Sequence, residues 1–431
     1  MEYTEALILV ISFVVFLALR VPIAYSIGLS ALLTLVVSMP FLPSVTTLAQ
    51  RMAASLDSFA LLAIPFFILA GQVMNRGGIA RRLIDFAKAI VGPFPGGLAF
   101  VNIIACMLFG AISGSAVAAA SAIGGFMNPM MEKEGYDKSF SAAVNITSAT
   151  TGLIIPPSNI LIIYSLASGG ISIAALFLAG YVPGILIGLA LMAVAGVYAF
   201  IKKYPTEKGV GIREFLKRFL NAFPSLLLLV VVMGGIVAGI FTATEASAVA
   251  VLYTFILAFA YKEITVKDVS GILLETAKTT AIVMLLIAAS VAMSWVMSYE
   301  SIPQEISAGL LGISDNPIVI LILINLILLF VGIFMDITPA VLIFTPIFLP
   351  IVTKMGMDPV HFGIIMILNL CIGLCTPPVG SVLFVGCGVA GLSIQKVIRP
   401  LLPLFVVMLV VLILVTYIPE LSLWIPELFG F

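Results

Sequence analysis

The chain repeats part of its own sequence at a constant separation of 221 residues, over positions 129–173 and 350–394. Within these stretches 12 of 45 aligned residues are identical, where about a tenth would be expected for so apolar a composition. The identical residues include two consecutive prolines in each copy, Pro156-Pro157 and Pro377-Pro378. Because consecutive prolines interrupt a helix at a fixed place, both halves of the chain are predicted to form the same elements in the same order.

The composition is that of a membrane protein. Hydrophobic residues make up 62% of the chain and charged residues only 9%, whereas about a quarter of a soluble domain is charged. Apolar stretches long enough to cross a bilayer recur along the whole length, and the longest polar stretch, residues 202–218, is short enough to be a linker. The net charge of zero argues against a nucleic-acid partner. We therefore predict an all-α polytopic membrane protein.

Basic residues close to the ends of spans mark the cytoplasmic side. They gather in residues 76–88 and 202–218, while both termini are acidic, so both termini are predicted to lie on the outer side of the membrane. These constraints give five spans in each half. The expected spans are 5–20, 22–40, 58–75, 139–179 and 181–201 in the first half, and 222–240, 242–261, 272–298, 359–395 and 403–418 in the second. Since five is odd, residues 1–210 and 211–431 are predicted to be inverted repeats.

The segment after the third span of each half supports the inversion. Residues 77–92 are amphipathic and basic, which predicts a surface arm helix on the inner side. The equivalent residues 300–316 carry acids and no base, which predicts an arm helix on the outer side. The apolar segments that follow, 95–130 and 317–350, are predicted to be re-entrant hairpins, each of two short helices that meet at a tip.

Breaks in the hairpins and in the fourth spans predict a binding site. The two tips carry small or polar residues around Gly114 and Asp336, and the fourth spans, 139–179 and 359–395, are broken at the double prolines. The carbonyl groups freed at such breaks suit a hard cation, and the N-termini of the half-helices favour an anionic group. Alternatively, each break serves only to kink a helix for packing, but four breaks in two matched pairs favour a site.

These motifs resemble the large membrane subunit of the tripartite ATP-independent periplasmic (TRAP) transporters over essentially the whole chain. The residues that carry the resemblance are 56–59, 63–67, 113–115, 156–159, 242–246, 335–336 and 376–380. The resemblance implies a sodium-coupled importer of an organic acid with the fold of the ion-transporter superfamily. It also implies a place in the bacterial inner membrane, which would make both termini periplasmic. In such an elevator transporter, hairpins and broken helices form a transport domain that slides against a scaffold made by the remaining spans.

The resemblance also implies partners: a small four-helix membrane subunit and a periplasmic substrate-binding protein. The substrate would be a carboxylate such as sialic acid or a C4-dicarboxylate, and the chain would not be an enzyme. An alternative is a stand-alone ion-coupled carboxylate carrier without a soluble partner. An intramembrane enzyme or a channel is a third hypothesis. Catalysis has little support, because the sequence holds no Ser/His/Asp set and no HExxH motif.

By symmetry between the halves we expect two or more Na⁺ ions and no organic cofactor. The residues predicted to hold Na⁺ are Ser113, Gly114, Ser115, Thr151, Pro156, Asp336, Thr338, Thr376, Pro377 and Gly380. Those predicted to face the substrate are Ser115, Ser158, Asn159, Asp336 and Ser381. Asp336 either helps to hold Na⁺ or caps the hairpin tip, and Glu245, which only one half contains, fits a structural contact better than ion coupling.

Overall fold

The computed structural model describes residues 4–206, 211–314 and 316–431. The expected domain boundary at residue 210 and Asp315 of the second arm segment lie outside these ranges. Every regular element in the described part of the chain is a helix, which confirms the all-α fold class. Eight of these helices are long and apolar enough to cross a membrane, and five shorter apolar helices accompany them.

The first half contains twelve helical elements in the described residues. They are α1 (Thr4–Ala18), α2 (Ile23–Ser38), α3 (Phe41–Leu56), η1 (Phe59–Leu62), α4 (Ala63–Arg76), α5 (Ile79–Val91), α6 (Gly97–Ser113), α7 (Ala116–Lys133), α8 (Lys138–Ala149), η2 (Thr151–Leu153), α9 (Asn159–Ala167) and α10 (Ile173–Lys202).

The second half follows the same order. Its helices are α11 (Ile212–Val237), α12 (Ala243–Ala260), α13 (Val266–Tyr299), α14 (Ile302–Ile313), α15 (Pro317–Phe334), α16 (Ile337–Lys354), α17 (Pro359–Gly373), α18 (Ser381–Ala390), α19 (Ile394–Tyr417) and α20 (Glu420–Leu428). The offset of 221 residues carries α7 onto α16 without a residue of difference. The duplication seen in the sequence is therefore a duplication of structure.

The two halves differ at two places. Helix α13 is one helix of 34 residues, whereas the equivalent stretch of the first half is divided into α3, η1 and α4. Conversely, α10 is one helix of 30 residues, and its equivalent is divided into α19 and α20 at Pro419. Helices α3 and α20 were not among the elements expected from the sequence.

The broken helices are shorter than the sequence suggested. The segment expected over 139–179 ends at Ala167, because Gly169 and Gly170 adopt positive φ angles of 87° and 101° and turn the chain. The segment expected over 359–395 ends at Ala390, where Gly391 closes the helix in the left-handed conformation. The next helix of each half, α10 or α19, therefore begins earlier than predicted.

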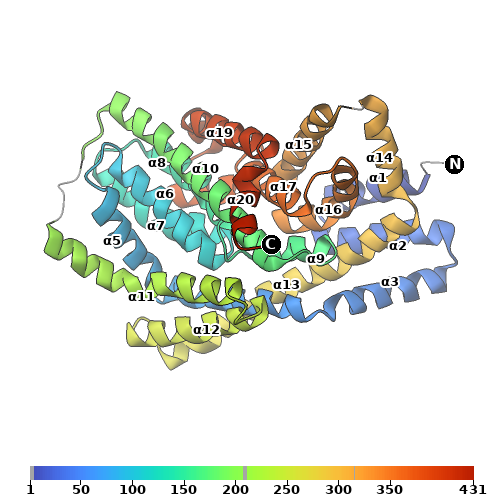
Figure 1. Ribbon diagram of the computed structural model, residues 1–431, viewed down its shortest axis with the longest axis horizontal. Coiled ribbons are helices and arrows are strands. Elements are labelled where there is room, and N and C mark those ends of the chain that lie inside the picture. The colour runs from blue at the N-terminus through green and yellow to red at the C-terminus, as the bar shows by residue number, and fades with distance from the viewer. Residues whose placement is uncertain (1–3, 207–210, 315) are drawn as a thin grey trace.

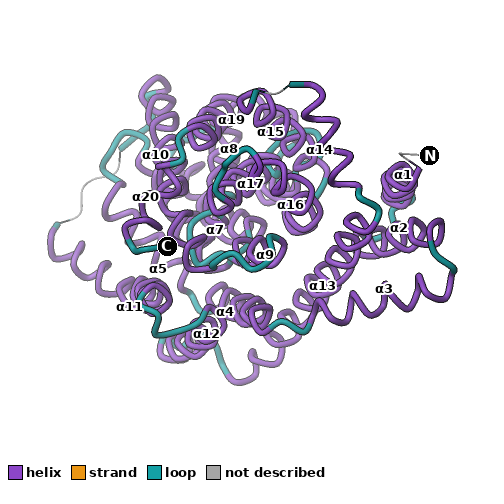
Figure 2. The backbone as a smooth tube through the Cα atoms, turned by 45° about the vertical axis from the view of Figure 1, so that its right-hand side comes forward, coloured by secondary structure: helices purple, strands orange, loops and turns teal. Residues whose placement is uncertain are grey.

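The helices pack into two groups, which Figures 1 and 2 show from two sides. Helices α1–α4 and α11–α13 pack on one another and form the flanking group, along the lower and right-hand sides of Figure 2. Helices α6–α10 and α15–α20 form the hairpin group. The sequence grouped α10 and α19 with the scaffold, but α10 packs on α6, α17 and α19, and α19 packs on α8. By their contacts both belong with the hairpins.

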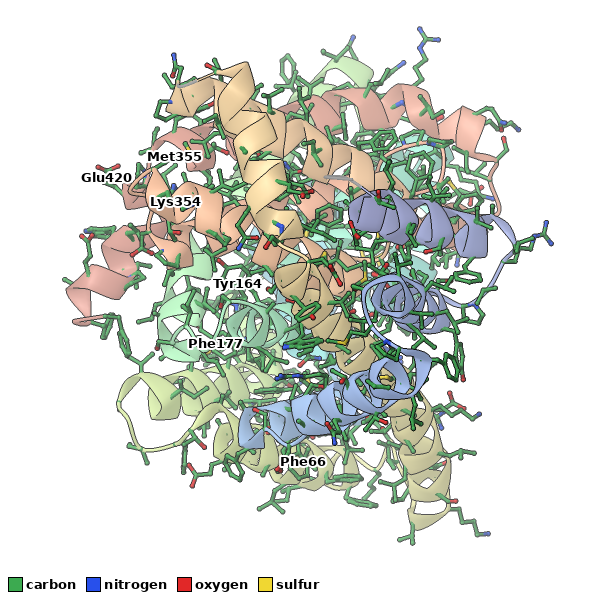
Figure 3. The ribbon with its side chains drawn as sticks, turned by 90° about the vertical axis from the view of Figure 1, so that its right-hand side faces the viewer. Phe66, Tyr164, Phe177, Lys354, Met355 and Glu420 are labelled. Carbon is green, nitrogen blue, oxygen red and sulfur yellow. The ribbon has the colours of Figure 1, made fainter. Side chains whose placement is uncertain are left out.

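Few helices join the two groups. Arm helix α5 packs on α6 of the hairpin group and on α11 of the flanking group, and α14 packs on both α13 and α16. Direct contact between the groups runs mainly through α4 with α6 and α13 with α16. In Figure 3 Phe66 of α4 lies in the lower part, while Lys354 at the end of α16 and Met355 just after it lie towards the upper left. Residues of both hairpin tips lie close to α4 and α13 at this junction.

Backbone contacts hold each hairpin against its own broken helix. Gly110 of α6 crosses Gly152 so closely that a Cβ atom on Gly152 would lie 2.3 Å from the Gly110 Cα. In the second half, a Cβ on Gly373 would lie 2.5 Å from the Gly332 Cα of α15. Glycine at these crossings lets two backbones meet, as small residues do at helix interfaces in membranes.

Candidate functional site

A cavity of about 510 Å³ lies at the junction of the hairpin and flanking groups. Both hairpin tips, α9 and α18 form one wall, and α4 and α13 form the other. This volume is within the range of small-molecule binding sites. The polar residues that line the cavity are Gln72, Asn75, Ser113, Ser115, Ser121, Asn159, Thr279, Asp336, Thr338 and Ser381.

The first hairpin tip makes a tight turn, and Ser113 and Ser115 of this tip line the cavity. Gly114 ends α6 in the left-handed conformation, with φ 61°, and its N–H donates to the Gly110 carbonyl at 2.9 Å. Ser115 begins α7, and its hydroxyl oxygen accepts from the Ala118 N–H at 3.2 Å. A Cβ atom on Gly114 would lie 2.6 Å from the Asn159 Nδ2 atom. The left-handed backbone conformation of Gly114 therefore favours glycine where the tip meets the broken helix.

The second tip places a carboxylate at the equivalent position. Asp336 begins α16, and one of its carboxylate oxygens accepts from the Ile337 N–H at 2.6 Å. Asp336 and Thr338 both line the cavity. The capping role considered for Asp336 is thus present, and the role in holding Na⁺ stays a prediction. In the cavity lining, as far as the structure describes it, Asp336 is the sole charged side chain.

The breaks in the broken helices lie behind the cavity. The peptide bonds Pro156-Pro157 and Pro377-Pro378 are both cis. The Thr151 hydroxyl donates to the Ser148 carbonyl at 2.6 Å. Ser158 donates in the same way to Leu153, and Thr376 to Ile372. The predicted site residues that do not line the cavity are Thr151, Pro156, Ser158, Thr376, Pro377 and Gly380.

The two broken helices are tied to each other. The Tyr164 hydroxyl on α9 donates to the Pro359 carbonyl at the start of α17, at 2.7 Å. Tyr164 is fully buried, and Figure 3 shows it well inside the outline of the molecule. The broken helices of the two halves therefore form one connected support for both hairpin tips.

Three buried polar atoms of the cavity wall have no hydrogen-bond partner in the protein. They are Ser113 Oγ, Asn159 Oδ1 and Ser381 Oγ. Buried polar atoms of native proteins nearly always have a partner, so each exception needs an explanation. A bound ion, substrate or water in the cavity would satisfy all three.

Sequence reasoning missed the residues on the flanking wall. Gln72 and Asn75 are three residues apart on α4, and Thr279 lies on α13. A signal was present, because two amides on one face of an apolar span are costly unless they serve a site. Glu245, by contrast, is not in the cavity lining: its carboxylate accepts from the Thr242 N–H at 2.8 Å and caps α12, which supports the structural reading.

A polytopic helical chain in which paired hairpins and broken helices surround a cavity with polar groups in its wall has the build of a secondary transporter rather than an enzyme. The chain belongs to the family described as "Tripartite ATP-independent periplasmic transporter, DctM component", whose model matches residues 10–421. It is accordingly the large component of a tripartite transporter, as the resemblance noted in the sequence indicated.

Individual relatives cover nearly the whole chain. The protein YgiK of Salmonella typhimurium, described as uncharacterized, is 56% identical over 100% of this chain and 99% of its own length. The C4-dicarboxylate TRAP transporter large permease protein DctM of Pseudomonas aeruginosa is 43% identical over 94% of each chain. The sialic acid TRAP transporter large permease protein SiaM of Vibrio cholerae is 42% identical over 88% of this chain and 89% of its own.

The fold is also found in solved structures. The Alcanivorax borkumensis YdaH transporter, whose crystal structure is described as having an unusual topology, matches with a TM-score of 0.66. The match covers 90% of this chain and 89% of that one, at 12% sequence identity. At that identity the likeness concerns the fold alone.

Proposed function

We propose that this chain imports an organic acid across the bacterial inner membrane, driven by the Na⁺ gradient. The observation that carries the proposal is the cavity between the hairpin tips and the flanking helices, whose wall contains Asp336 and three unpartnered buried polar atoms. Hydroxyl, carbonyl and carboxylate oxygens are the ligands that hard cations prefer. The names of relatives for C4-dicarboxylate and sialic acid support a carboxylate as the substrate.

The two sodium sites follow the two repeats in this proposal. Ser113, Gly114 and Ser115 with the carbonyls near Thr151 and Pro156 form the first site. The second comprises Asp336, Thr338, Thr376, Pro377 and Gly380. The Na⁺ ions would fix the tips against the broken helices, and the substrate carboxylate would meet Ser115, Asn159 and Ser381. Ser158 is not in the cavity lining, and its hydroxyl donates to the Leu153 carbonyl.

An elevator movement accounts for transport across the membrane. The hairpin group touches the flanking group mainly through α4, α13 and the arm helices, so a limited interface separates two bodies. Sliding of the hairpin group would carry the cavity from one side of the membrane to the other. A periplasmic binding protein would deliver the substrate, and a small four-helix membrane subunit would accompany the chain. A carrier that works without a soluble partner is the alternative.

Proteoliposomes test the proposal. We expect the chain, reconstituted with its small subunit and loaded binding protein, to accumulate a radiolabelled organic acid only when an inward Na⁺ gradient is imposed. Uptake that is equal with K⁺ in place of Na⁺ would contradict sodium coupling. Uptake of free acid at the same rate without the binding protein would favour the stand-alone carrier.

The Ser115→Ala variant tests whether Ser115 is part of the binding site or only caps a helix. Both Ser115 and Ser172 begin a helix, and each hydroxyl accepts from the N–H three residues on at 3.2 Å. Either substitution by Ala should cost about 1 kcal/mol of helix stability. Only Ser115 lines the cavity, so Ser115→Ala should lower Na⁺-driven uptake roughly tenfold or more, while Ser172→Ala leaves it near normal. Equal uptake by both variants would remove Ser115 from the site.

A further inference from the structure

A second pocket, of about 220 Å³, lies between arm helix α5 and the first turns of α11, which pack against each other (Figures 1 and 2). We call it the arm pocket. The described residues that line it are all polar: Arg82, Asp85, Glu214, Lys217, Arg218 and Asn221. None of them lines the cavity at the hairpin tips. The arm pocket is therefore a separate site, and bases outnumber acids in its wall.

Aromatic and cationic contacts hold the walls of the arm pocket in place. The Phe86 ring of α5 lies 5.6 Å from the Phe219 ring of α11, measured between the ring centroids, so the two helices are joined beside the pocket. The Arg82 guanidinium lies over the Tyr261 ring, 3.6 Å from its centroid, and donates to the Gly78 carbonyl at 2.9 Å. These contacts preorganise the pocket, which lowers the entropic cost of binding a ligand there.

Hydrogen-bond donors in the arm pocket remain open to a ligand. The Arg218 Nε atom donates to Glu214 Oε1 at 2.9 Å, but the terminal nitrogens of Arg218 have no partner among the described contacts. Arg82 also has an acid nearby, with Glu263 Oε1 at 3.7 Å. Lys217 is exposed, and no described ion pair joins it to an acid. A guanidinium and an ammonium group side by side suit the oxygens of a phosphate.

The surroundings of the arm pocket match the head-group level of a membrane. Residues 76–88 and 212–221 hold seven Lys or Arg and two Asp or Glu, a net charge of +5. Beyond Arg218 no further charge occurs in α11, and the apolar side chains of Leu220 and Phe223 are exposed. Leu220 follows Lys217 by three residues and so lies beside it on the helix surface. A basic pocket next to an exposed apolar strip is the pattern that binds anionic lipids.

We propose that the arm pocket binds the phosphate of an anionic phospholipid whose acyl chains lie along Leu220 and Phe223. Lys217 and Arg218 hold the phosphate, because Asp85 repels a negative group placed against the opposite wall. Asp85 instead accepts from hydroxyl groups of the head group. Since α5 also packs on the hairpin group, the bound lipid strengthens the junction between the arm helix and the flanking group. This inference depends neither on Na⁺ coupling nor on the substrate.

Lipid binding to the purified full-length chain tests the proposal. Native mass spectrometry of the chain in detergent would give apparent dissociation constants for phosphatidylglycerol and for phosphatidylcholine with the same acyl chains. We expect phosphatidylglycerol to bind roughly tenfold more tightly, because its head group carries a net negative charge. Glycerol 3-phosphate supplies a phosphate and hydroxyls without acyl chains, and it should bind roughly a hundredfold more weakly than phosphatidylglycerol.

Two substitutions locate the lipid in the arm pocket. Lys217→Gln and Arg218→Gln each remove one base from the lining, and each should weaken phosphatidylglycerol binding about tenfold. Arg213→Gln is the matched control, because it removes the same charge from an exposed position of α11 outside the lining. It should weaken binding no more than about twofold. An unchanged thermal unfolding midpoint without added lipid would show that all three variants are folded.

Three results would each overturn the lipid assignment. Equal binding of phosphatidylglycerol and phosphatidylcholine would show that the chain does not select an anionic head group. If Arg213→Gln weakens binding as much as Lys217→Gln does, the attraction comes from the charge of the whole surface and not from the arm pocket. If glycerol 3-phosphate binds as tightly as phosphatidylglycerol, the ligand is a soluble phosphate ester. None of these results bears on Na⁺-driven uptake, so the proposed function is tested separately.

Discussion

Asp336→Asn is expected to reduce Na⁺-driven uptake roughly a hundredfold while leaving the protein folded. The reason lies in what the substitution keeps and what it removes. Asparagine is as good a helix N-cap as aspartate, so its side-chain oxygen can still accept from the Ile337 N–H. The negative charge, however, is lost, and with it the one charged group in the described cavity lining that could neutralise a cation. Initial uptake rates at several Na⁺ concentrations measure the effect.

Asp358→Asn is the matched control for this substitution. Asp358 begins α17, and its carboxylate accepts from the Val360 N–H at 2.7 Å, but it is not in the cavity lining. The Asp358→Asn variant should retain near-normal Na⁺-driven uptake. If Asp336→Asn also transports normally, Asp336 is a helix cap and nothing more, and the second sodium site must be built from other residues.

Gly152→Ala is expected to lower the thermal unfolding midpoint by several degrees. The new methyl group would lie 2.3 Å from the Gly110 Cα and 2.6 Å from its carbonyl carbon. Both are backbone atoms, so no side chain can move aside, and the hairpin must separate from the broken helix. Overpacking of this kind costs about 1–3 kcal/mol. The midpoint can be followed by the loss of the monodisperse peak in fluorescence-detected size-exclusion chromatography after heating.

The control is another helical glycine. A Cβ atom on Gly125 of α7 would meet nothing within 4 Å, and alanine is the better helix former, so Gly125→Ala should leave the midpoint unchanged or raise it slightly. Gly373→Ala should behave like Gly152→Ala, because its methyl group would lie 2.5 Å from the Gly332 Cα. If neither Gly152→Ala nor Gly373→Ala changes the thermal unfolding midpoint, the backbone crossings at these glycines are not tightly packed.

Local sequence signals predicted the duplicated part of the fold. Prolines, glycines and charges act over a few residues, and they placed both hairpins, both tips and the two arm helices close to their observed bounds. The tip residues Ser113, Ser115 and Asp336 do meet in one cavity with Asn159 and Ser381. This much follows from the sequence because each signal is local and each occurs twice.

Features that depend on packing were not foreseen. The boundary expected between the spans 139–179 and 181–201 falls at Gly180, yet Gly180 lies inside α10, where a Cβ atom would lie 2.2 Å from the Ile154 carbonyl oxygen. The true break is at Gly169 and Gly170, whose positive φ angles the sequence does not reveal. The flanking wall with Gln72 was missed for a similar reason: which face of α4 meets the hairpins is decided by tertiary contact.

The unbroken α13 also has a mechanical consequence. Its 34 residues extend about 51 Å, while the hydrocarbon core is about 30 Å thick. Residues 279–299 carry no charge and suffice to cross it, so we expect residues 266–278 to project beyond the bilayer. Force applied to this projection passes along one hydrogen-bonded rod to Thr279 at the cavity wall. In the other half, residues 57–62 separate α3 from α4 and would absorb the same force before it reached Gln72.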